Sequence, residues 1–130
     1  MTQEKTVNKK GRILIIDDQP FMIKLIQYNL KKEGYITITE TDGLKAYNEI
    51  EKINPDLIIL DIRMPKISGT ELCRKFRAKD SLKETPILFL TGQIAEKDSP
   101  ALQNSGATDF MTKPFSPAEL IAKVNHYTGK

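Results

Sequence analysis

The chain is poor in the residues that bind zinc or form disulfides. Its 130 residues include one cysteine, Cys73, and one histidine, His126. A single cysteine allows no internal disulfide, which is typical of a cytosolic protein, and one residue of each kind cannot supply a zinc site. We therefore expect Cys73 to be a small helix residue and His126 to lie in the last turn of a helix, neither with a catalytic role.

Long apolar runs and nucleotide loops are also absent. No apolar run approaches the roughly 20 residues needed to cross a bilayer, and residues 1–12 lack the apolar centre of a signal peptide. The glycine patterns Gly-x-Gly-x-x-Gly and Gly-x-x-x-x-Gly-Lys, which cradle nucleotide phosphates, do not occur. The sequence predicts a cytoplasmic protein with neither a membrane segment nor these loops.

What is present indicates one folded domain with a charged tail. The chain has 39% hydrophobic and 28% charged residues, a balance that argues against disorder. The net charge of +3 comes from the beginning of the chain, because residues 13–130 hold 16 of the 20 basic and 16 of the 17 acidic residues. We expect residues 1–11 to be a flexible basic tail and residues 12–130 to be a single domain.

Strand and helix signals alternate five times along this domain. Continuous Ile/Leu runs at 13–16 and 57–60 are typical of strands buried on both faces of a parallel sheet. The predicted fold class is therefore α/β, a doubly wound parallel sheet of five strands with helices on both faces. The expected strands are Arg12–Asp17, Tyr35–Thr39, Leu57–Leu60, Ile87–Leu90 and Thr108–Met111; the expected helices run from Pro20 to Gly34, Gly43 to about Ile53, Ser68 to about Lys79, and from Ser116 onward.

The segment after Gly92 allows two interpretations. A short helix can start at Ser99, with Pro100 in its first turn. A longer helix that starts near Ala95 would be kinked by Pro100. The sequence leaves both open.

Basic residues gather on the helix that follows Ser68. The simplest expectation is a solvated helix face, with docking of a partner as the alternative. The residues are Arg74, Lys75, Arg77 and Lys79.

Acidic residues follow two of the predicted strands. Asp17 and Asp18 end the first strand and Asp61 ends the third. Because the carboxyl ends of parallel strands share one edge of a sheet, these carboxylates can meet there. Like charges about 4 Å apart repel by roughly 4 kcal/mol at an effective dielectric of 20, so a shared site needs a cation or a proton. Oxygen ligands favour Mg²⁺, or Mn²⁺; the alternative is that the aspartates are helix caps and turn residues.

A hydroxyl and an ammonium group follow the last two strands. Thr91 comes after the fourth strand and Lys113 after the fifth. Each is more often a cap or a solvated residue, but together they can donate hydrogen bonds to a phosphoryl group on Asp61. The small Gly92 beside Thr91 leaves room for such a group.

These residues together resemble the receiver domain of two-component response regulators. The resemblance rests on Asp17-Asp18, Asp61-x-x-Met64-Pro65-x-x-x-Gly69, Thr91-Gly92 and Lys113-Pro114-Phe115, which stand in the family's order and at close to its spacing from about Arg12 to Thr128. It implies a flavodoxin-like sheet of order 2-1-3-4-5, in the CheY-like superfamily. It also implies that Asp61 is the phosphoacceptor and that the peptide bond before Pro114 is cis.

The resemblance further implies roles for the residues around Asp61. Asp18 would bind Mg²⁺ directly, Asp17 largely through water, and the backbone carbonyl of Arg63 would complete the protein ligands. The catalytic group would also include Thr91 and Lys113, which would hold the phosphoryl oxygens. Thr91 and Phe110 would form the switch.

In function, the resemblance implies a phosphoprotein that switches a protein-interaction surface. A sensor histidine kinase or a phosphotransfer protein would donate the phosphoryl group, with Mg²⁺ as cofactor. Such a protein catalyses only its own phosphorylation and dephosphorylation and is not counted as an enzyme. Because the sequence stops at Lys130, we expect a downstream protein target, no direct DNA binding, no membrane contact, and a monomer or a phosphorylation-dependent dimer.

Two other functions fit parts of the pattern. A phosphatase similar to the haloacid dehalogenases also uses an aspartyl phosphate, but it has a second acid two residues after the nucleophile, where this chain has Arg63. A receiver-like scaffold that binds partners without being phosphorylated is the second alternative, and it predicts no Mg²⁺ site.

Overall fold

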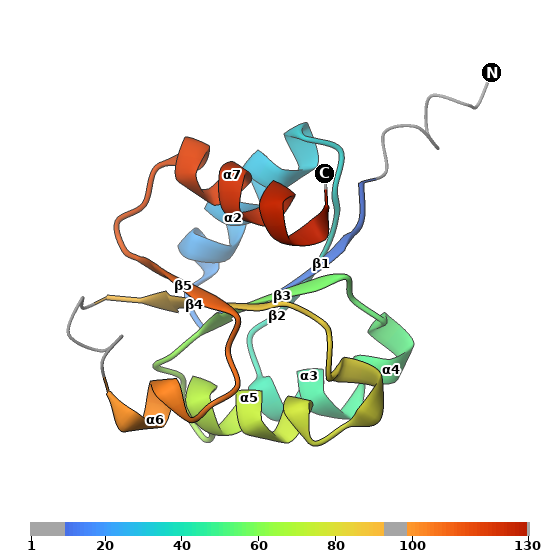
Figure 1. Ribbon diagram of the computed structural model, residues 1–130. Helices are drawn as coiled ribbons and strands as arrows, with labels where there is room; N and C mark the ends of the chain where they lie inside the picture. Colours follow the sequence, from blue (N-terminus) through green and yellow to red (C-terminus); the bar gives the residue numbers. More distant parts are fainter. Residues whose placement is uncertain (1–9, 93–98, 130) are drawn as a thin grey trace.

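The protein folds as one parallel sheet between two layers of helices (Figure 1). The structure, a computed structural model, describes residues 10–92 and 99–129. The strand order is β2-β1-β3-β4-β5, and every neighbouring pair is parallel, which confirms the predicted fold class and order. The strands are β1 (Arg12–Ile16), β2 (Ile36–Glu40), β3 (Leu57–Asp61), β4 (Ile87–Thr91) and β5 (Asp109–Thr112).

Each face of the sheet is covered by its own group of helices. In Figure 1, α2 and α7 lie above the sheet and α3, α4, α5 and α6 lie below it. The helices are α2 (Pro20–Lys32), α3 (Gly43–Asn48), α4 (Ile50–Ile53), α5 (Gly69–Arg77), α6 (Pro100–Gln103) and α7 (Pro117–Thr128), with a 3₁₀ turn, η1 (Asp80–Leu82), after α5.

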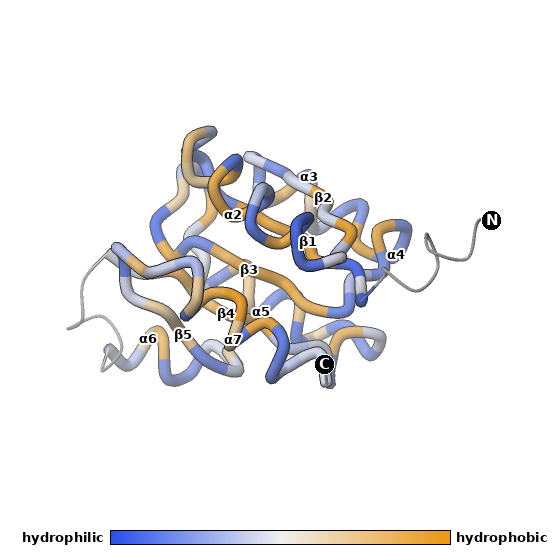
Figure 2. The backbone as a smooth tube through the Cα atoms, turned by 90° about the horizontal axis from the view of Figure 1, so that it is seen from above, coloured by the Kyte–Doolittle hydropathy of each residue, from blue (hydrophilic) through white to orange (hydrophobic). Residues whose placement is uncertain are grey.

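The strands supply both apolar cores because their side chains alternate between the two faces. Leu14 and Ile16 pack with residues of α3 and α5, whereas Ile13 and Ile15 pack with residues of α2 and α7. All four are fully buried, and burying a side chain of this size contributes about 1.5–3 kcal/mol. Figure 2 shows the result as an apolar interior along β3 and β4.

The short helix near Pro100 follows the first of the two sequence interpretations. Helix α6 begins at Pro100, and the Ser99 hydroxyl accepts a hydrogen bond from the backbone N–H of Leu102. A helix that starts near Ala95 would lie in residues 93–98, outside the described residues.

One predicted helix is divided. The segment expected to be helical from Gly43 to Ile53 contains α3 and α4, which meet at Glu49 with φ −104° and ψ 6°. The N–H of Glu49 is shared between the carbonyls of Lys45 and Ala46, so the last turn of α3 tightens there. The prediction of one continuous helix was wrong at this residue.

Arg77 is not part of a solvated face, contrary to the prediction. Its guanidinium donates to the carbonyl oxygens of Leu82 and Thr85, each at 2.6 Å, and of Gly106 at 2.8 Å. It also donates to the Thr108 hydroxyl at 3.1 Å. Arg77 therefore joins the end of α5 both to the segment that directly follows it and to the distant loop before β5.

Cys73 and His126 have the ordinary positions expected of them. Cys73 is a fully buried, free cysteine on α5. His126 lies in the last turn of α7, with its ring edge-to-face against Tyr127 at 4.7 Å between centroids.

The two ends of the described chain bear on two further predictions. Residues 1–9 lie outside the described residues, so the basic tail stays a prediction, but the N–H of Lys10 already donates to the Gly34 carbonyl at the start of β2. Within the described part of the chain, none of the helices has the length and apolar character needed to span a bilayer.

Candidate functional site

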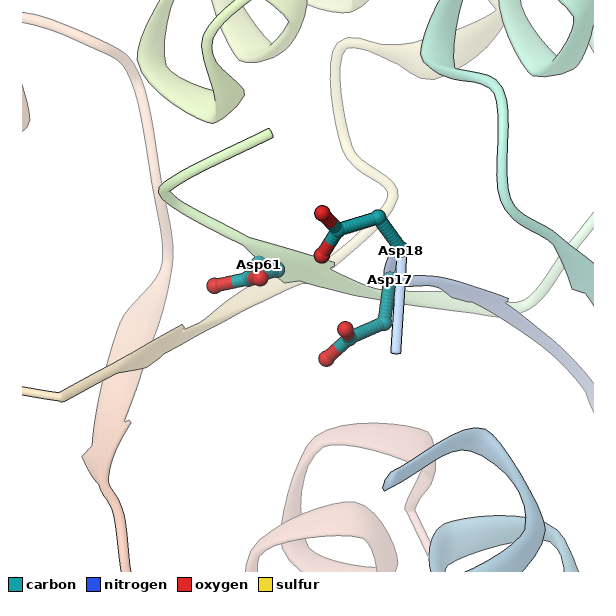
Figure 3. A group of neighbouring side chains, drawn as sticks. All are labelled: Asp17, Asp18 and Asp61. Atoms are coloured by element: carbon teal, nitrogen blue, oxygen red, sulfur yellow. The ribbon is translucent and has the colours of Figure 1, made fainter. Parts of the chain in front are cut away.

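The three predicted aspartates meet at the carboxyl edge of the sheet. Asp17 and Asp18 follow β1, and Asp61 is the last residue of the adjacent strand β3. Each contributes a carboxylate oxygen to a group in which all such atoms lie within 4.8 Å of one another. Figure 3 shows the three side chains as neighbours at the ends of the two strands.

Lys113 closes the group from the other side. Its Nζ lies 3.6 Å from Oδ2 of Asp17 and 3.7 Å from Oδ1 of Asp61. The Lys113–Pro114 peptide bond is cis, as predicted. The N–H of Lys113 donates to the Thr91 carbonyl at 2.7 Å, which fixes the backbone of Lys113 beside the end of β4. Lys113 therefore approaches the first and third strands, although it follows the fifth.

Burial leaves the aspartates with more negative charge than the protein neutralises. Asp17 is fully buried, and its Oδ2 has no hydrogen-bond partner within residues 10–92 and 99–129. Burial raises the pKa of Asp17, against the lowering effects of the Gln19 N–H and of Lys113. Burial, with the charge of Asp17, raises the pKa of Asp61 to about 6, although Lys113 opposes the shift. One ammonium group thus faces three carboxylates.

This donor set fits a hard divalent cation. All three side-chain ligands are carboxylates, and Asp18 is exposed, so a bound ion could keep water ligands, as Mg²⁺ prefers. The orphaned Oδ2 of the buried Asp17 is the feature that a cation would satisfy. Arg63 lies beside the group, because its backbone N–H donates to Oδ1 of Asp61 at 3.4 Å.

Thr91 and Phe110 lie on the two strands next to Asp61. Thr91 ends β4 and is almost fully buried. Asp61 is paired with Leu90, so Thr91 lies one residue beyond it along the same edge. Phe110 is on β5, opposite Phe89 of β4. It is partly buried, and it packs against the apolar core on the α5 side of the sheet. The structure therefore brings the other predicted site residues to one edge, whereas Phe110 lies two residues before the end of its strand.

Sequence reasoning missed the role of Gly69 in this site. A Cβ atom at Gly69 would lie 2.2 Å from the carbonyl oxygen of Asp61 and 2.8 Å from Cα of Ile62. The N–H of Gly69 donates to the Ile62 carbonyl at 2.8 Å. Only glycine lets the start of α5 pack this closely on the backbone that carries Asp61. Gly69 was part of the quoted motif, which was the available signal. The sequence does not otherwise indicate that two backbone segments lie this close together.

The fold and the site together define a doubly wound α/β protein with a cluster of three carboxylates at the carboxyl edge of its sheet. Residues 13–125 match the response regulator receiver domain family, and the chain belongs to that family. This agrees with the resemblance seen in the sequence motifs.

Relatives with names and solved structures support the same family. The chain is 44% identical over 118 residues to the alkaline phosphatase synthesis transcriptional regulatory protein PhoP of Bacillus subtilis, an alignment that covers 91% of this chain and 48% of PhoP. It resembles the chemotaxis response regulator CheY4 of Vibrio cholerae at 30% identity and a TM-score of 0.84, covering 90% of this chain and 98% of CheY4. It also resembles the receiver domain of a sensor histidine kinase from Pseudomonas aeruginosa, whose crystal structure has a magnesium ion coordinated in the active site cleft. The identity is 29% and the TM-score 0.85, and the match covers 92% of this chain and 98% of that receiver domain.

The chain spans about half the length of the curated relatives it matches. Those relatives are named as transcriptional regulators, and one as DNA-binding. The expected absence of direct DNA binding therefore stays a prediction about the present residues alone.

Proposed function

We propose that this receiver domain accepts a phosphoryl group on Asp61 from a phosphohistidine. A carboxylate oxygen of Asp61 attacks phosphorus while the bond from phosphorus to the imidazole nitrogen breaks, and the imidazole leaves. The supporting observation is the buried Asp17 with its orphaned Oδ2, next to Asp61 and Lys113. A protein that only presented a surface to partners would gain nothing from this uncompensated charge, which argues against the scaffold alternative.

The residues around Asp61 divide the work between holding charge and placing atoms. Asp17, Asp18, Asp61 and the backbone carbonyl of Arg63 would hold Mg²⁺, with Mn²⁺ as a substitute. When bound, the ion supplies positive charge that offsets the aspartates and the incoming phosphoryl oxygens. Lys113 adds an ammonium group beside Asp17 and Asp61, so that catalysis consists of positioning and charge neutralisation.

The phosphodonor protein docks on α2 in this proposal. Phe21 and Tyr28 have exposed fractions of 76% and 63%, and their spacing of seven residues places both on the same face of this helix. Phe21 is the second residue of α2, three positions after Asp18. A partner seated on Phe21 therefore stands beside the edge where its phosphohistidine must meet Asp61.

The output is a change at the same edge of the sheet. The phosphoryl group draws the Thr91 hydroxyl toward it, and Phe110, partly buried on the next strand, turns into the space that Thr91 leaves. This biases two existing conformations, and reversing a ratio of 1:99 takes about 5.5 kcal/mol of differential stabilisation. The domain then acts as a switch in two-component signalling in the cytoplasm, recognised by a downstream protein, and catalyses only its own modification.

Mass spectrometry of the intact protein tests this function. Incubation with acetyl phosphate and Mg²⁺ should add the mass of one phosphoryl group to the wild type, and omission of Mg²⁺ should prevent it. Asp61→Asn should stay unmodified, whereas Asp109→Asn, which alters an aspartate outside the cluster, should be modified normally. An unmodified wild type, or equal modification of Asp61→Asn, would remove the proposal.

Docking on α2 has a separate test. Phe21→Ala should slow phosphoryl transfer from a cognate histidine kinase while leaving modification by acetyl phosphate unchanged, since the small donor needs no docking surface. Leu44→Ala, which shortens another exposed apolar side chain (40% exposed) on α3, is the matched control. Equal loss with both donors would place Phe21 in the fold or the site instead.

A further inference from the structure

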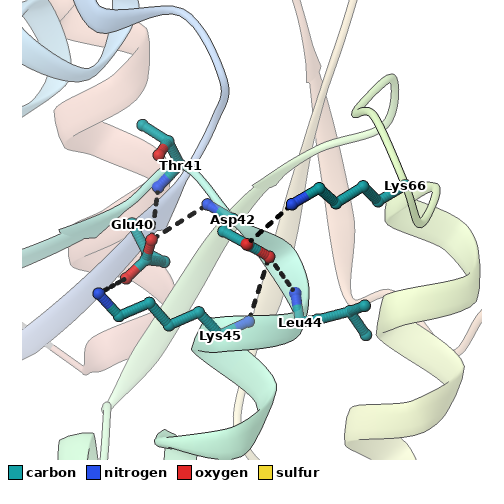
Figure 4. Close-up of polar contacts among 6 residues, drawn as sticks. All are labelled: Glu40, Thr41, Asp42, Leu44, Lys45 and Lys66. Atoms are coloured by element: carbon teal, nitrogen blue, oxygen red, sulfur yellow. Dashed lines mark hydrogen bonds and ion pairs between the residues drawn. The ribbon is translucent and has the colours of Figure 1, made fainter.

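Two loops at the carboxyl edge are joined by an ion pair that the phosphoryl chemistry above does not use. Lys66 lies in the loop between β3 and α5, and Asp42 lies in the loop between β2 and α3. Lys66 Nζ lies 3.4 Å from Oδ2 of Asp42 (Figure 4). The loop that carries Lys66 also carries Arg63, the residue proposed to offer its carbonyl to the metal.

Asp42 is a fixed partner in this pair. Its Oδ1 accepts hydrogen bonds from the N–H groups of Leu44 and Lys45 and so caps α3. Its own N–H donates to Oε2 of Glu40 at the end of β2. The capping bonds, led by that from Lys45, and the ammonium of Lys66 lower the pKa of Asp42. Oδ2 of Asp42 is therefore a charged acceptor held in place by the neighbouring strand and helix.

Lys66 has an unusual backbone conformation for a residue with a side chain. Its φ is +72°, in the left-handed region that favours glycine, and the Ile67 N–H donates to the Pro65 carbonyl at 2.7 Å around it. A non-glycine residue in this region carries strain that the surrounding structure must offset. Glycine would remove the strain but could not reach Asp42.

The side chain of Lys66 is not held by packing. Its exposed fraction is 68%, and a cavity of about 200 Å³ lies between the two loops, lined by Thr41, Asp42, Pro65 and Lys66. The Lys66 side chain meets solvent on one side and the cavity on the other. The charge of Asp42 is therefore what directs this side chain across the gap. The ion pair thus spans a gap between the loops.

We propose that the Asp42–Lys66 ion pair is a latch that holds the β3–α5 loop in the arrangement that binds the metal. The pair acts on the metal through the backbone of residues 62–68, which starts directly after Asp61 and includes the Arg63 carbonyl. Lys66 is a positioning residue, since it touches neither Asp61 nor the ion. The role of the ion pair in metal binding rests on the proposed function. Its effect on the conformation of the β3–α5 loop does not need the metal.

Hydrogen exchange of the metal-free protein, followed by mass spectrometry, tests the latch directly. Lys66→Met and Asp42→Asn should each speed amide exchange in residues 62–68 by about two- to fivefold, the range for an exposed ion pair. The asparagine can still accept the capping bonds, so α3 should exchange as in the wild type. The double variant should be no faster than either single one, and high salt should give the wild type the same rate.

Lys66→Gly separates the latch from simple backbone strain. This variant relieves the left-handed strain and should unfold at a higher temperature than Lys66→Met, yet it should show the same fast exchange in residues 62–68. Lys66→Arg, which keeps the charge, should restore slow exchange. A purely structural role for residue 66 predicts the reverse, with glycine giving the slowest exchange.

Metal affinity supplies the second measurement. Calorimetric titration with Mg²⁺ should show weaker binding in Lys66→Met and Asp42→Asn by a similar factor of about two to five. Lys45→Met is the matched control, because Lys45 pairs with Glu40 at 3.9 Å in the same cluster without reaching the β3–α5 loop. Its exchange in residues 62–68 and its Mg²⁺ affinity should equal those of the wild type.

The two proposals fail in different ways. Unchanged exchange of residues 62–68 in both Lys66→Met and Asp42→Asn would overturn the latch while leaving phosphorylation of Asp61 intact. An unmodified wild type in the acetyl phosphate experiment would overturn the proposed function, and the exchange rates would still decide whether the pair holds the loop.

Discussion

The charged groups at the two ends of helix α5 differ in how well their surroundings satisfy them. At its beginning, Gly69 packs against the backbone of Asp61, where the carboxylates outnumber the cation beside them. At its end, Arg77 donates to carbonyl oxygens of Leu82, Thr85 and Gly106. This nine-residue helix thus connects a site whose carboxylates are not fully neutralised with a site whose hydrogen-bonding groups are satisfied.

This difference separates what stabilises the fold from what performs the chemistry. A satisfied buried group stabilises the native state, and losing it leaves its partners unpaired. An unsatisfied buried charge destabilises the native state until a ligand supplies the missing partner. We therefore expect changes at the end of α5 to lower stability, and removal of charge at its beginning to raise stability while abolishing function.

Arg77→Met should have the largest effect on stability. It removes the hydrogen bonds to several partly buried carbonyls at once, so the free energy of unfolding should fall by about 3–4 kcal/mol. Urea denaturation followed by circular dichroism measures this loss. Lys75→Met, which removes an exposed charge from the same helix, should cost less than about 1 kcal/mol; an equal loss in both variants would contradict the special position of Arg77.

Gly69→Ala should come next, and it should affect both the fold and the site. The added Cβ would lie 2.2 Å from the carbonyl oxygen of Asp61, so the backbone must move. We expect a loss of about 2–3 kcal/mol, typical of overpacking, together with slower modification by acetyl phosphate. Gly92→Ala is the control for stability, because a Cβ there meets no atom within 4 Å. If both alanine variants unfold alike, the close packing on Asp61 is unimportant.

Asp61→Asn should act in the opposite direction and stabilise the metal-free protein. The pKa of Asp61 in the folded state is about 6, raised from 3.8 by burial and by Asp17, so the folded state binds a proton more tightly than the unfolded state. Stability from this group is complete below about pH 4 and is lost as the pH rises through about 6. Asp61→Asn should therefore gain about 3 kcal/mol at pH 8 and little at pH 4.

Thermal unfolding between pH 4 and pH 8 measures this effect. The wild type should lose stability across that range and regain it on addition of Mg²⁺, by about 1.4 kcal/mol at ten times the dissociation constant. Asp56→Asn, at the opposite edge of the sheet, should keep the pH profile of the wild type. A wild-type profile without a fall between pH 4 and pH 7 would show that Asp61 titrates normally.

Much of the fold could be predicted because its signals are local. The apolar runs of β1 and β3 require burial on both faces, and Ser99 with Pro100 marks one of the two helix starts that the sequence left open, the one at which α6 begins. The order of the strands came from the family resemblance, since no local signal specifies which strands are neighbours. The break at Glu49 and the contacts of Arg77 depend on residues far along the chain, so their sequence surroundings look like ordinary helix.

The site divides in the same way. Asp18, Asp61 and Lys113 were predicted from motifs, and the structure brings them together. The orphaned oxygen of Asp17 and the direction of the pKa of Asp61 were not predicted, because both depend on burial. The left-handed backbone of Lys66 was also unforeseen, since a lysine in a polar loop carries no sign of its conformation.

The smallest expected effect concerns an aspartate that shows the opposite behaviour to Asp61. Burial alone would raise the pKa of Asp109, but hydrogen bonds from Tyr127 at 2.6 Å and Lys123 at 3.0 Å outweigh it and lower that pKa. Tyr127→Phe should raise the pKa of Asp109 toward its ordinary value and cost about 0.5–1 kcal/mol at pH 7. Because this stability depends on the ionised carboxylate, it is lost as the pH falls through the folded pKa, so the cost should disappear in acid.

A carboxyl titration by NMR, read beside thermal unfolding, measures both quantities in the same protein. Thr128→Val, which changes a hydroxyl on α7 that bonds to Tyr35 and not to Asp109, is the control and should leave the titration of Asp109 unchanged. If Asp109 and Asp61 shifted in the same direction, hydrogen-bond donors would not be what distinguishes the two. Opposite shifts would instead show that hydrogen-bond donors decide the outcome of burial. Asp109, which has donors around it, is stabilised as a carboxylate, whereas Asp61, which has fewer, stays a strained and reactive one.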